Sequence, residues 1–157
     1  MRVRKGDSAP AFRLPGTDGT DEGRRDYTLL EYLGRPVVLV FYPGDETPVC
    51  TEQLTTYTQD VDQFGMLGAQ VLALSPQSVE SHERFSRHHG GFAFPLLADE
   101  AKEVGDAYGI VGPLGFYRRS VFVIDTGGVI RWIHRSVGGL TFQPTDDIVR
   151  AIERAAR

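Results

Sequence analysis

Residues 37–42 read VVLVFY, an unbroken run of β-branched, aliphatic and aromatic side chains. A half-exposed strand would alternate apolar with polar residues, so this run predicts a strand that is buried on both faces at the centre of a sheet. Residues 71–75, VLALS, repeat the same character. The polar residues 78–89 that follow have the composition of a surface helix, which we expect to end at the glycine pair before Pro95. The order strand, helix, strand predicts a βαβ unit.

The C-terminal part of the chain predicts a hairpin followed by a helix. Residues 120–125 and 129–134 are rich in strand-forming side chains, and the glycines of the intervening TGG segment can adopt the positive φ angles of a tight turn. Residues 146–156 place three branched aliphatic side chains on one face of a helix. Together these patterns predict an α/β fold with a mixed central β-sheet flanked by helices.

Length and composition narrow the class of protein. The chain has 157 residues, of which 41% are hydrophobic, and no repeat or linker divides it, so we expect a single domain over residues 1–157. Its net charge of -4 comes from interspersed acids and bases with no dense basic run, which argues against binding of nucleic acid. The longest apolar run is far below the ~18 residues of a membrane span, and residues 1–6 lack an apolar signal core. We therefore expect a cytoplasmic protein with no membrane partner.

The only cysteine, Cys50, follows the predicted central strand at the start of a predicted helix. Pro48 suits the first helical turn, and Thr47 falls at the N-cap, where its hydroxyl would either cap the helix or face the sulfur. The unpaired N–H groups of that turn would stabilise a thiolate. A thiolate held in this way can attack the O–O bond of a peroxide, and Pro43 would shape a narrow loop that limits access of water. A lone cysteine is also commonly an inert buried side chain, but this placement favours a nucleophile.

The spacing Pro43-x-x-x-Thr47-x-x-Cys50 resembles the active-site motif of the peroxiredoxins, thiol-dependent peroxidases with a thioredoxin-like fold. The resemblance continues through segments 7–14, 94–99, 107–109 and 119–125, and it is closest to the bacterioferritin-comigratory, or Q-type, group. It implies that Arg119, immediately before the strand at 120–125, contacts both the catalytic sulfur and the substrate; Arg118 is the less suitable candidate. A guanidinium there would stabilise the thiolate and donate hydrogen bonds to peroxide oxygen.

Two positions depart from that group. Thr55 stands where Q-type members often carry a second cysteine, and Gln53 stands where an acid usually supports the arginine. With one cysteine, the resemblance implies a one-cysteine cycle in which H2O2 or an organic hydroperoxide converts Cys50 to a sulfenic acid. Because no internal thiol can resolve this acid, an external thiol reductant is needed: thioredoxin, glutaredoxin or a low-molecular-weight thiol.

Other interpretations remain open at this point. Cys50 could belong to a non-catalytic peroxide sensor, a redox-regulated binding protein, or a thiol transferase, although a transferase normally shows Cys-x-x-Cys and has Thr47 here in place of its first cysteine. No cofactor or metal is expected, because the four histidines lack the i, i+4 spacing of a helical metal site and are interpreted as surface residues. Phe116 and Tyr117 would wall the peroxide site. Monomer and homodimer are both compatible with the sequence.

Overall fold

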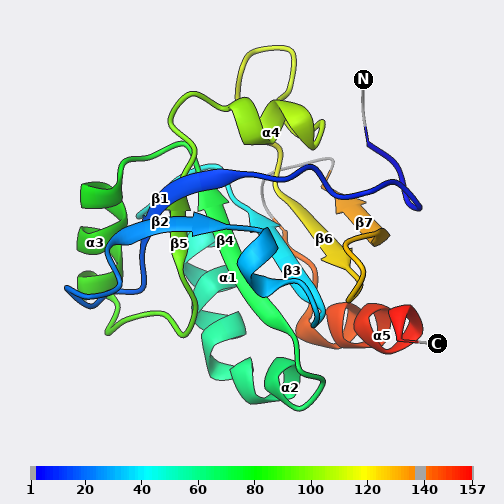
Figure 1. Cartoon of the computed structure of the whole chain (residues 1–157). Coiled ribbons are helices and arrows are strands. Elements are labelled where there is room, and N and C mark those ends of the chain that lie inside the picture. Colours follow the sequence, from blue (N-terminus) through cyan, green and yellow to red (C-terminus); the bar gives the residue numbers. More distant parts are fainter. Residues whose placement is uncertain (1–2, 137–140, 157) are drawn as a thin grey trace.

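The computed structural model describes residues 3–136 and 141–156, which form a seven-stranded sheet with helices packed around it (Figure 1). The sheet order is β2-β1-β5-β4-β3-β6-β7. The strands are β1 (Arg13–Thr17), β2 (Arg25–Thr28), β3 (Val37–Phe41), β4 (Gln70–Ser75), β5 (Leu96–Ala98), β6 (Ser120–Ile124) and β7 (Ile130–Arg135). The helices are the 3-10 turn η1 (Leu30–Tyr32), α1 (Pro48–Gln59), α2 (Val61–Gly65), α3 (Val79–His88), α4 (Glu103–Ala107) and α5 (Thr145–Ala155).

Strand β3 is central, as the run at residues 37–42 predicts. All five of its residues are buried, and it pairs parallel with β4 on one side and antiparallel with β6 on the other. β4 and β5 are parallel and are connected through α3, which confirms the βαβ unit. β6 and β7 form the expected antiparallel hairpin. The predicted mixed α/β sheet is therefore confirmed.

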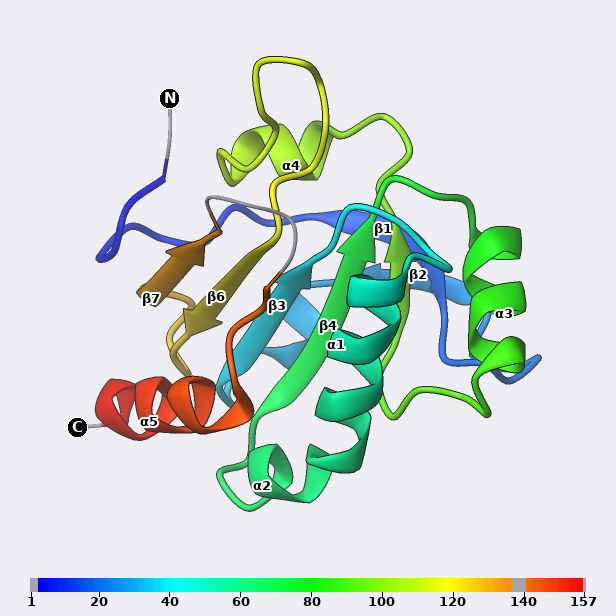
Figure 2. The ribbon, with the colours of Figure 1, turned by 180° about the vertical axis from the view of Figure 1, so that it is seen from behind.

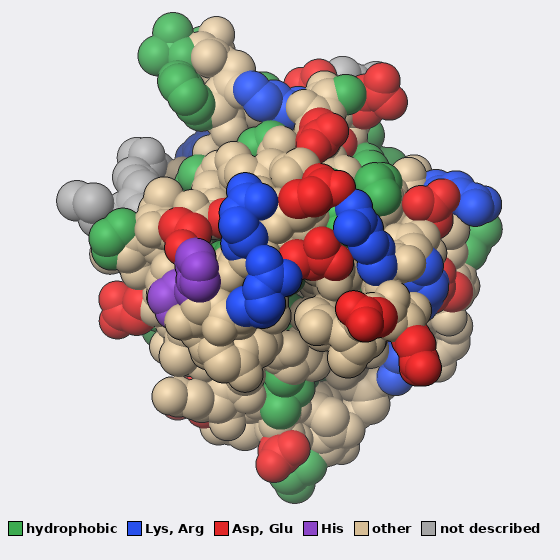
Figure 3. Space-filling view, turned by 90° about the vertical axis from the view of Figure 1, so that its left-hand side faces the viewer, with side chains coloured by type: hydrophobic (Ala, Val, Ile, Leu, Met, Phe, Trp, Pro, Cys, Tyr) green, Lys and Arg blue, Asp and Glu red, His purple; other side chains and the backbone are tan. Residues whose placement is uncertain are grey.

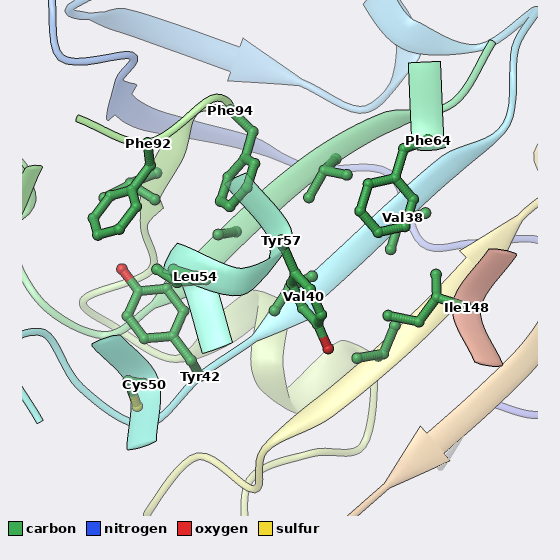
Figure 4. Packing of buried hydrophobic residues seen from close by; sticks show 14 of the residues in the cluster. Val38, Val40, Tyr42, Cys50, Leu54, Tyr57, Phe64, Phe92, Phe94 and Ile148 are labelled. Atoms are coloured by element: carbon green, nitrogen blue, oxygen red, sulfur yellow. The ribbon is translucent and has the colours of Figure 1, made fainter. Parts of the chain in front are cut away.

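Side chains of β3 alternate between two cores because successive residues of a strand point to opposite faces. Val38 and Val40 join the core beneath α1 and α5, while Val37, Leu39 and Phe41 join the core on the other face. Figure 2 shows α1 and α5 together in front of the sheet, and Figure 4 shows the packing of the first core. Cys50 belongs to that first core, so the thiol lies on the α1 face.

The antiparallel pair β1–β2 was not predicted. Proline and glycine at positions 15 and 16 are unusual inside a strand, yet β1 lies between β2 and β5. Gly16 pairs with Leu97, and a Cβ at this glycine would lie 2.7 Å from the carbonyl oxygen of Leu96. Glycine is therefore required because β1 approaches the backbone of β5 so closely. Within residues 3–136 and 141–156, no helix is long and apolar enough to span a membrane.

Candidate active site

Helix α1 begins at Pro48, immediately after Thr47 at the N-cap, as predicted. Thr47 is extended (φ -84°, ψ 146°), and its carbonyl oxygen accepts the first helical bond, 2.9 Å from Thr51 N. The Thr47 side chain makes no cap hydrogen bond; its hydroxyl donates instead to Gly44 O at 2.9 Å. The capping alternative is therefore wrong, although the hydroxyl still stabilises the loop before the helix.

Cys50 is the third residue of α1 and is only 1% exposed. Its position in the first turn places it near backbone N–H groups that have no helical partner, and these groups favour a negative charge on sulfur. Tyr42 and Leu54 pack in the same core as the thiol (Figure 4). Burial by itself disfavours a charge on sulfur, so a thiolate at this position also needs a cation beside it.

Arg119 supplies that cation. Its Nη2 donates to Cys50 Sγ at 3.3 Å, and the residue is 4% exposed. The strand pairing brings the two residues together: Ser120 of β6 lies opposite Phe41 of β3, so Arg119 stands beside the loop that connects β3 to α1. Arg119 O also accepts from Ser136 N at 2.8 Å, which fixes the backbone of the arginine. The neighbouring Arg118 instead donates to backbone carbonyl groups of residues 135 and 136.

Gln53 holds the other end of the same guanidinium. It lies one turn after Cys50 on α1, is fully buried, and its Oε1 accepts from Arg119 Nη1 at 2.5 Å. The amide Nε2 lies 3.4 Å from the hydroxyl of Tyr57, which donates to the carbonyl oxygen of Gln143 at 2.5 Å. Burial raises the pKa of Tyr57, so this hydroxyl keeps its proton. A neutral amide therefore occupies the place that the resemblance gives to an acid.

Pro43 and the residues after it form the loop between β3 and α1. Pro43 is half-buried. The side chain of Asp45 contacts His82. Glu46 adopts a left-handed backbone conformation (φ 64°). A non-glycine residue rarely adopts this conformation without local support. Glu46 receives that support from His88, whose Nδ1 lies 2.6 Å from its Oε2, and from His89 at 3.2 Å.

The expected surface position of the histidines is wrong for His82. This side chain is fully buried, and its Nδ1 lies 2.7 Å from Asp45 Oδ2. Its partner is 37 residues away in the chain, so no local pattern identified the pair. Histidine side chains do lie at the surface on the face that carries α3 (Figure 3). Among residues 3–136 and 141–156, no three His, Cys, Asp or Glu side chains are grouped so that they could hold a metal ion.

The expectation that Tyr117 walls the site is also wrong. Tyr117 packs against Phe41 in the core on the opposite face of the sheet from Cys50, and its hydroxyl donates to Asp99. Phe116 is 71% exposed. Tyr117 was misplaced because its proximity to Arg119 in the sequence does not reveal to which face of the sheet its side chain points.

A buried lone cysteine in the first turn of a helix, facing an arginine that immediately precedes a strand of a mixed sheet, defines a thioredoxin-like protein of the thiol-redox class. The sequence model of the AhpC/TSA family matches residues 5–133. The chain therefore belongs to the AhpC/TSA family, the peroxiredoxins.

The similar proteins agree with this assignment. Chloroplastic peroxiredoxin Q of Oryza sativa subsp. japonica is 35% identical over 149 residues, which cover 94% of this chain and 64% of the rice protein. The chain thus spans under two thirds of that relative. The solved bacterioferritin comigratory protein of Xanthomonas campestris has a TM-score of 0.81 at 27% identity, covering 93% of this chain and 92% of that one. Mycobacterium tuberculosis AhpC has the same fold, with a TM-score of 0.90 at 24% identity over 99% of this chain and 94% of that one.

Proposed function

We propose that this chain is a thiol-dependent peroxidase that reduces H2O2 and organic hydroperoxides through Cys50. The observation that carries the proposal is the contact of 3.3 Å between Arg119 Nη2 and Cys50 Sγ in a buried site. A guanidinium keeps its charge at all physiological pH values, so it stabilises the thiolate and remains available as a donor to peroxide oxygen. Alkyl peroxide reduction is an activity of the related Xanthomonas campestris protein, which supports the same chemistry here.

In the proposed reaction, the Cys50 thiolate attacks one peroxide oxygen. The S–O bond forms as the O–O bond breaks, and the electron pair of the O–O bond moves onto the leaving oxygen, which takes a proton from solvent and departs as water or an alcohol. Cys50 is left as a sulfenic acid and the peroxide is reduced. Arg119 donates to the oxygen on which negative charge develops, and it is in place before the reaction begins.

The loop supplies the remaining roles. Pro43, which is half-buried before α1, limits the space and water around the sulfur. The Thr47 hydroxyl donates to Gly44 O and so fixes the turn of the loop, and Thr47 is the N-cap of the helix that carries Cys50. Both residues thus act by fixing the position of Cys50 relative to the incoming peroxide.

Return to the thiol form needs an external reductant, because Cys50 is the only cysteine. A thiol attacks the sulfenic sulfur and releases water, and a second thiol then attacks the resulting mixed disulfide. Thioredoxin or glutaredoxin can supply both thiols from one molecule, whereas a low-molecular-weight thiol acts twice. This requirement suits a reducing compartment such as the cytoplasm. The chain would serve cell redox homeostasis there as an antioxidant enzyme, as a monomer or a homodimer.

The decisive experiment follows H2O2 consumption by fully reduced protein under single-turnover conditions, with Cys50→Ser as the control. We expect rapid consumption that is lost in the variant, and mass spectrometry should place one added oxygen on Cys50. A rate no faster than that of a free small thiol would contradict the proposal.

Multiple turnovers then separate an enzyme from a sensor. With thioredoxin and its reductase, glutaredoxin, or a low-molecular-weight thiol present, an enzyme continues to consume peroxide with at least one of them. Consumption that stops after about one equivalent per thiol with every reductant would indicate a peroxide sensor instead.

A further inference from the structure

Asp45, in the middle of the loop between β3 and α1, is anchored to the body of the protein by its side chain. Its Oδ2 lies 2.7 Å from His82 Nδ1 and accepts from Ser81 Oγ at 2.7 Å, and its Oδ1 accepts from the Tyr42 hydroxyl at 2.7 Å. The backbone N–H of Asp45 donates to Gln77 Oε1 at 2.9 Å. The Asp45 and His82 side chains are 2% and 0% exposed, so water does not compete for these bonds.

The hydrogen bonds define where protons lie in this cluster. His82 Nε2 is 3.0 Å from Leu97 O, and a carbonyl oxygen only accepts, so Nε2 carries a hydrogen. Burial and the nearby Asp45 raise the pKa of Tyr42 well above its ordinary value, so its hydroxyl donates to the carboxyl group. The contact between His82 Nδ1 and Asp45 Oδ2 then requires a further proton between these two acceptors. A hydrogen bond in a dry site therefore joins the two side chains.

The cluster is connected to the thiol through the backbone of the loop. Asp45 lies two residues before Thr47, whose carbonyl oxygen begins the helix turn that holds Cys50. Between them, Glu46 has the left-handed φ of 64° that only external support maintains. The ring of Tyr42 packs in the same core as Cys50 (Figure 4). The bond from α3 to Asp45 thus fixes the short segment that leads into the nucleophile.

Buried ion pairs contribute little net stability compared with apolar side chains of similar volume, but they hold a fixed geometry. We propose that His82 and Asp45 are positioning residues for peroxide reduction, which hold the loop at residues 43–47 in the conformation that aligns Cys50 for attack on the O–O bond. This inference rests on the proposed peroxidase function. Neither residue touches the reacting atoms; both act through the loop.

Three single variants test the pair, and a fourth variant is a control. The two ring nitrogens of His82 can be replaced separately by the amide nitrogens of glutamine and asparagine. In His82→Gln the amide nitrogen falls near the position of Nε2 and keeps the bond to Leu97 O, while the bond to Asp45 is lost. In His82→Asn the amide nitrogen falls near Nδ1 and retains a neutral donor to Asp45. Asp45→Asn keeps the shape of the loop residue without its charge. Arg84→Gln is the control, because Arg84 is an exposed residue of the same helix, α3.

Two rate constants are measured for Cys50 in each variant at one pH: the reaction with H2O2 and the alkylation by iodoacetamide. Alkylation needs an accessible thiolate but not the aligned loop. We expect His82→Gln to lower the peroxide rate constant about 30-fold, since small misplacements of reacting groups have effects of this order, and to change alkylation less than about threefold. His82→Asn should lose less, and Arg84→Gln should stay within about twofold of the wild type.

The double variant Asp45→Asn/His82→Gln should lose no more than the more affected single variant, because both substitutions break one contact. Three outcomes would each overturn the inference. The peroxide and alkylation rate constants could fall equally, or folded His82→Gln could keep the wild-type peroxide rate. The loss in the double variant could also equal the product of the losses in the two single variants. If the His82 variants do not fold, Asp45→Asn alone tests the inference through its rate constants for H2O2 and for iodoacetamide. A fast wild type with an equally fast Asp45→Asn overturns only this inference, whereas a slow wild type overturns the peroxidase function with it.

Discussion

Arg119 joins Cys50 to Gln53: one guanidinium nitrogen donates to the sulfur from 3.3 Å, and the other donates to the Gln53 amide oxygen. The two partners lie three residues apart on α1 and therefore face the arginine from the same side of the helix. The planar guanidinium can meet both at once, which a lysine ammonium on a flexible chain cannot do with the same geometry. Its Gln53 contact orients the arginine without adding a negative charge next to the sulfur.

Replacement of Arg119 should slow peroxide reduction strongly. Arg119→Met removes both the charge and the donor, and the peroxide rate constant should fall by about 10²- to 10³-fold, the range seen when one donor to a developing oxyanion is removed. Arg119→Lys keeps the charge and loses the planar pair of donors, so its loss should be smaller, about tenfold. Stopped-flow measurement of H2O2 consumption tests both variants. Equal losses in the two variants would show that charge alone does not explain the role of Arg119.

Gln53→Glu should make the thiol less reactive at neutral pH. The new carboxylate would pair with Arg119 and oppose the stabilisation that the guanidinium gives to the thiolate. The pH profile of Cys50 alkylation by iodoacetamide should therefore move to higher pH. Glu52→Gln is the control, because Glu52 is the exposed neighbour on the same helix, and it should leave the profile unchanged. A move to lower pH in Gln53→Glu would mean that orientation of the arginine outweighs its charge.

Leu54→Ala should destabilise the protein by about 3 kcal/mol, because deletion of a buried leucine side chain leaves a cavity. Leu54 is fully buried in the core beneath α1. Leu114→Ala makes the same chemical change at a side chain that is 84% exposed, and it should alter the free energy of unfolding by less than about 0.5 kcal/mol. Urea unfolding followed by circular dichroism measures both. Similar effects at the two leucines would contradict the assigned core.

The parts of the fold that were predicted are those with strong local patterns. The apolar run at residues 37–42 identified the central strand, and the glycines after Asp125 identified the β6–β7 hairpin, because burial and turn geometry impose those residue types directly. β1 was missed because its strand pairing overrides the local preference of Pro15 and Gly16. The need for glycine there comes from the approach of β5, some 80 residues later, which no local pattern reveals.

In the candidate site, too, the features with a local pattern were predicted from the residues, and those that depend on distant contacts were not. The position of Cys50 in the first turn of α1, with Thr47 at the N-cap, followed from proline and spacing alone. The contact with Arg119 was expected only through the family resemblance, since it depends on strand pairing across 69 positions. The pair of Asp45 and His82 was missed because a histidine on a polar helix is usually exposed. The only signal in the sequence was Asp45 itself, because a carboxylate that becomes buried in the loop beside Cys50 needs a partner.

The pairing of Glu31 with Arg25 should make stability depend on pH in the acid range. The hydrogen bond from Arg25 lowers the pKa of Glu31 from 4.5 to about 2. A carboxyl group with a lowered pKa in the folded state contributes stability above its ordinary value, and this contribution is lost as the pH falls from 4.5 through about 2. Since the pair is partly exposed, it should contribute roughly 0.5 kcal/mol. Urea unfolding of wild type and Glu31→Gln should show this difference at pH 6 and a smaller one at pH 3. Arg25→Gln should remove most of the same contribution, and a difference that grows on acidification would contradict the pairing.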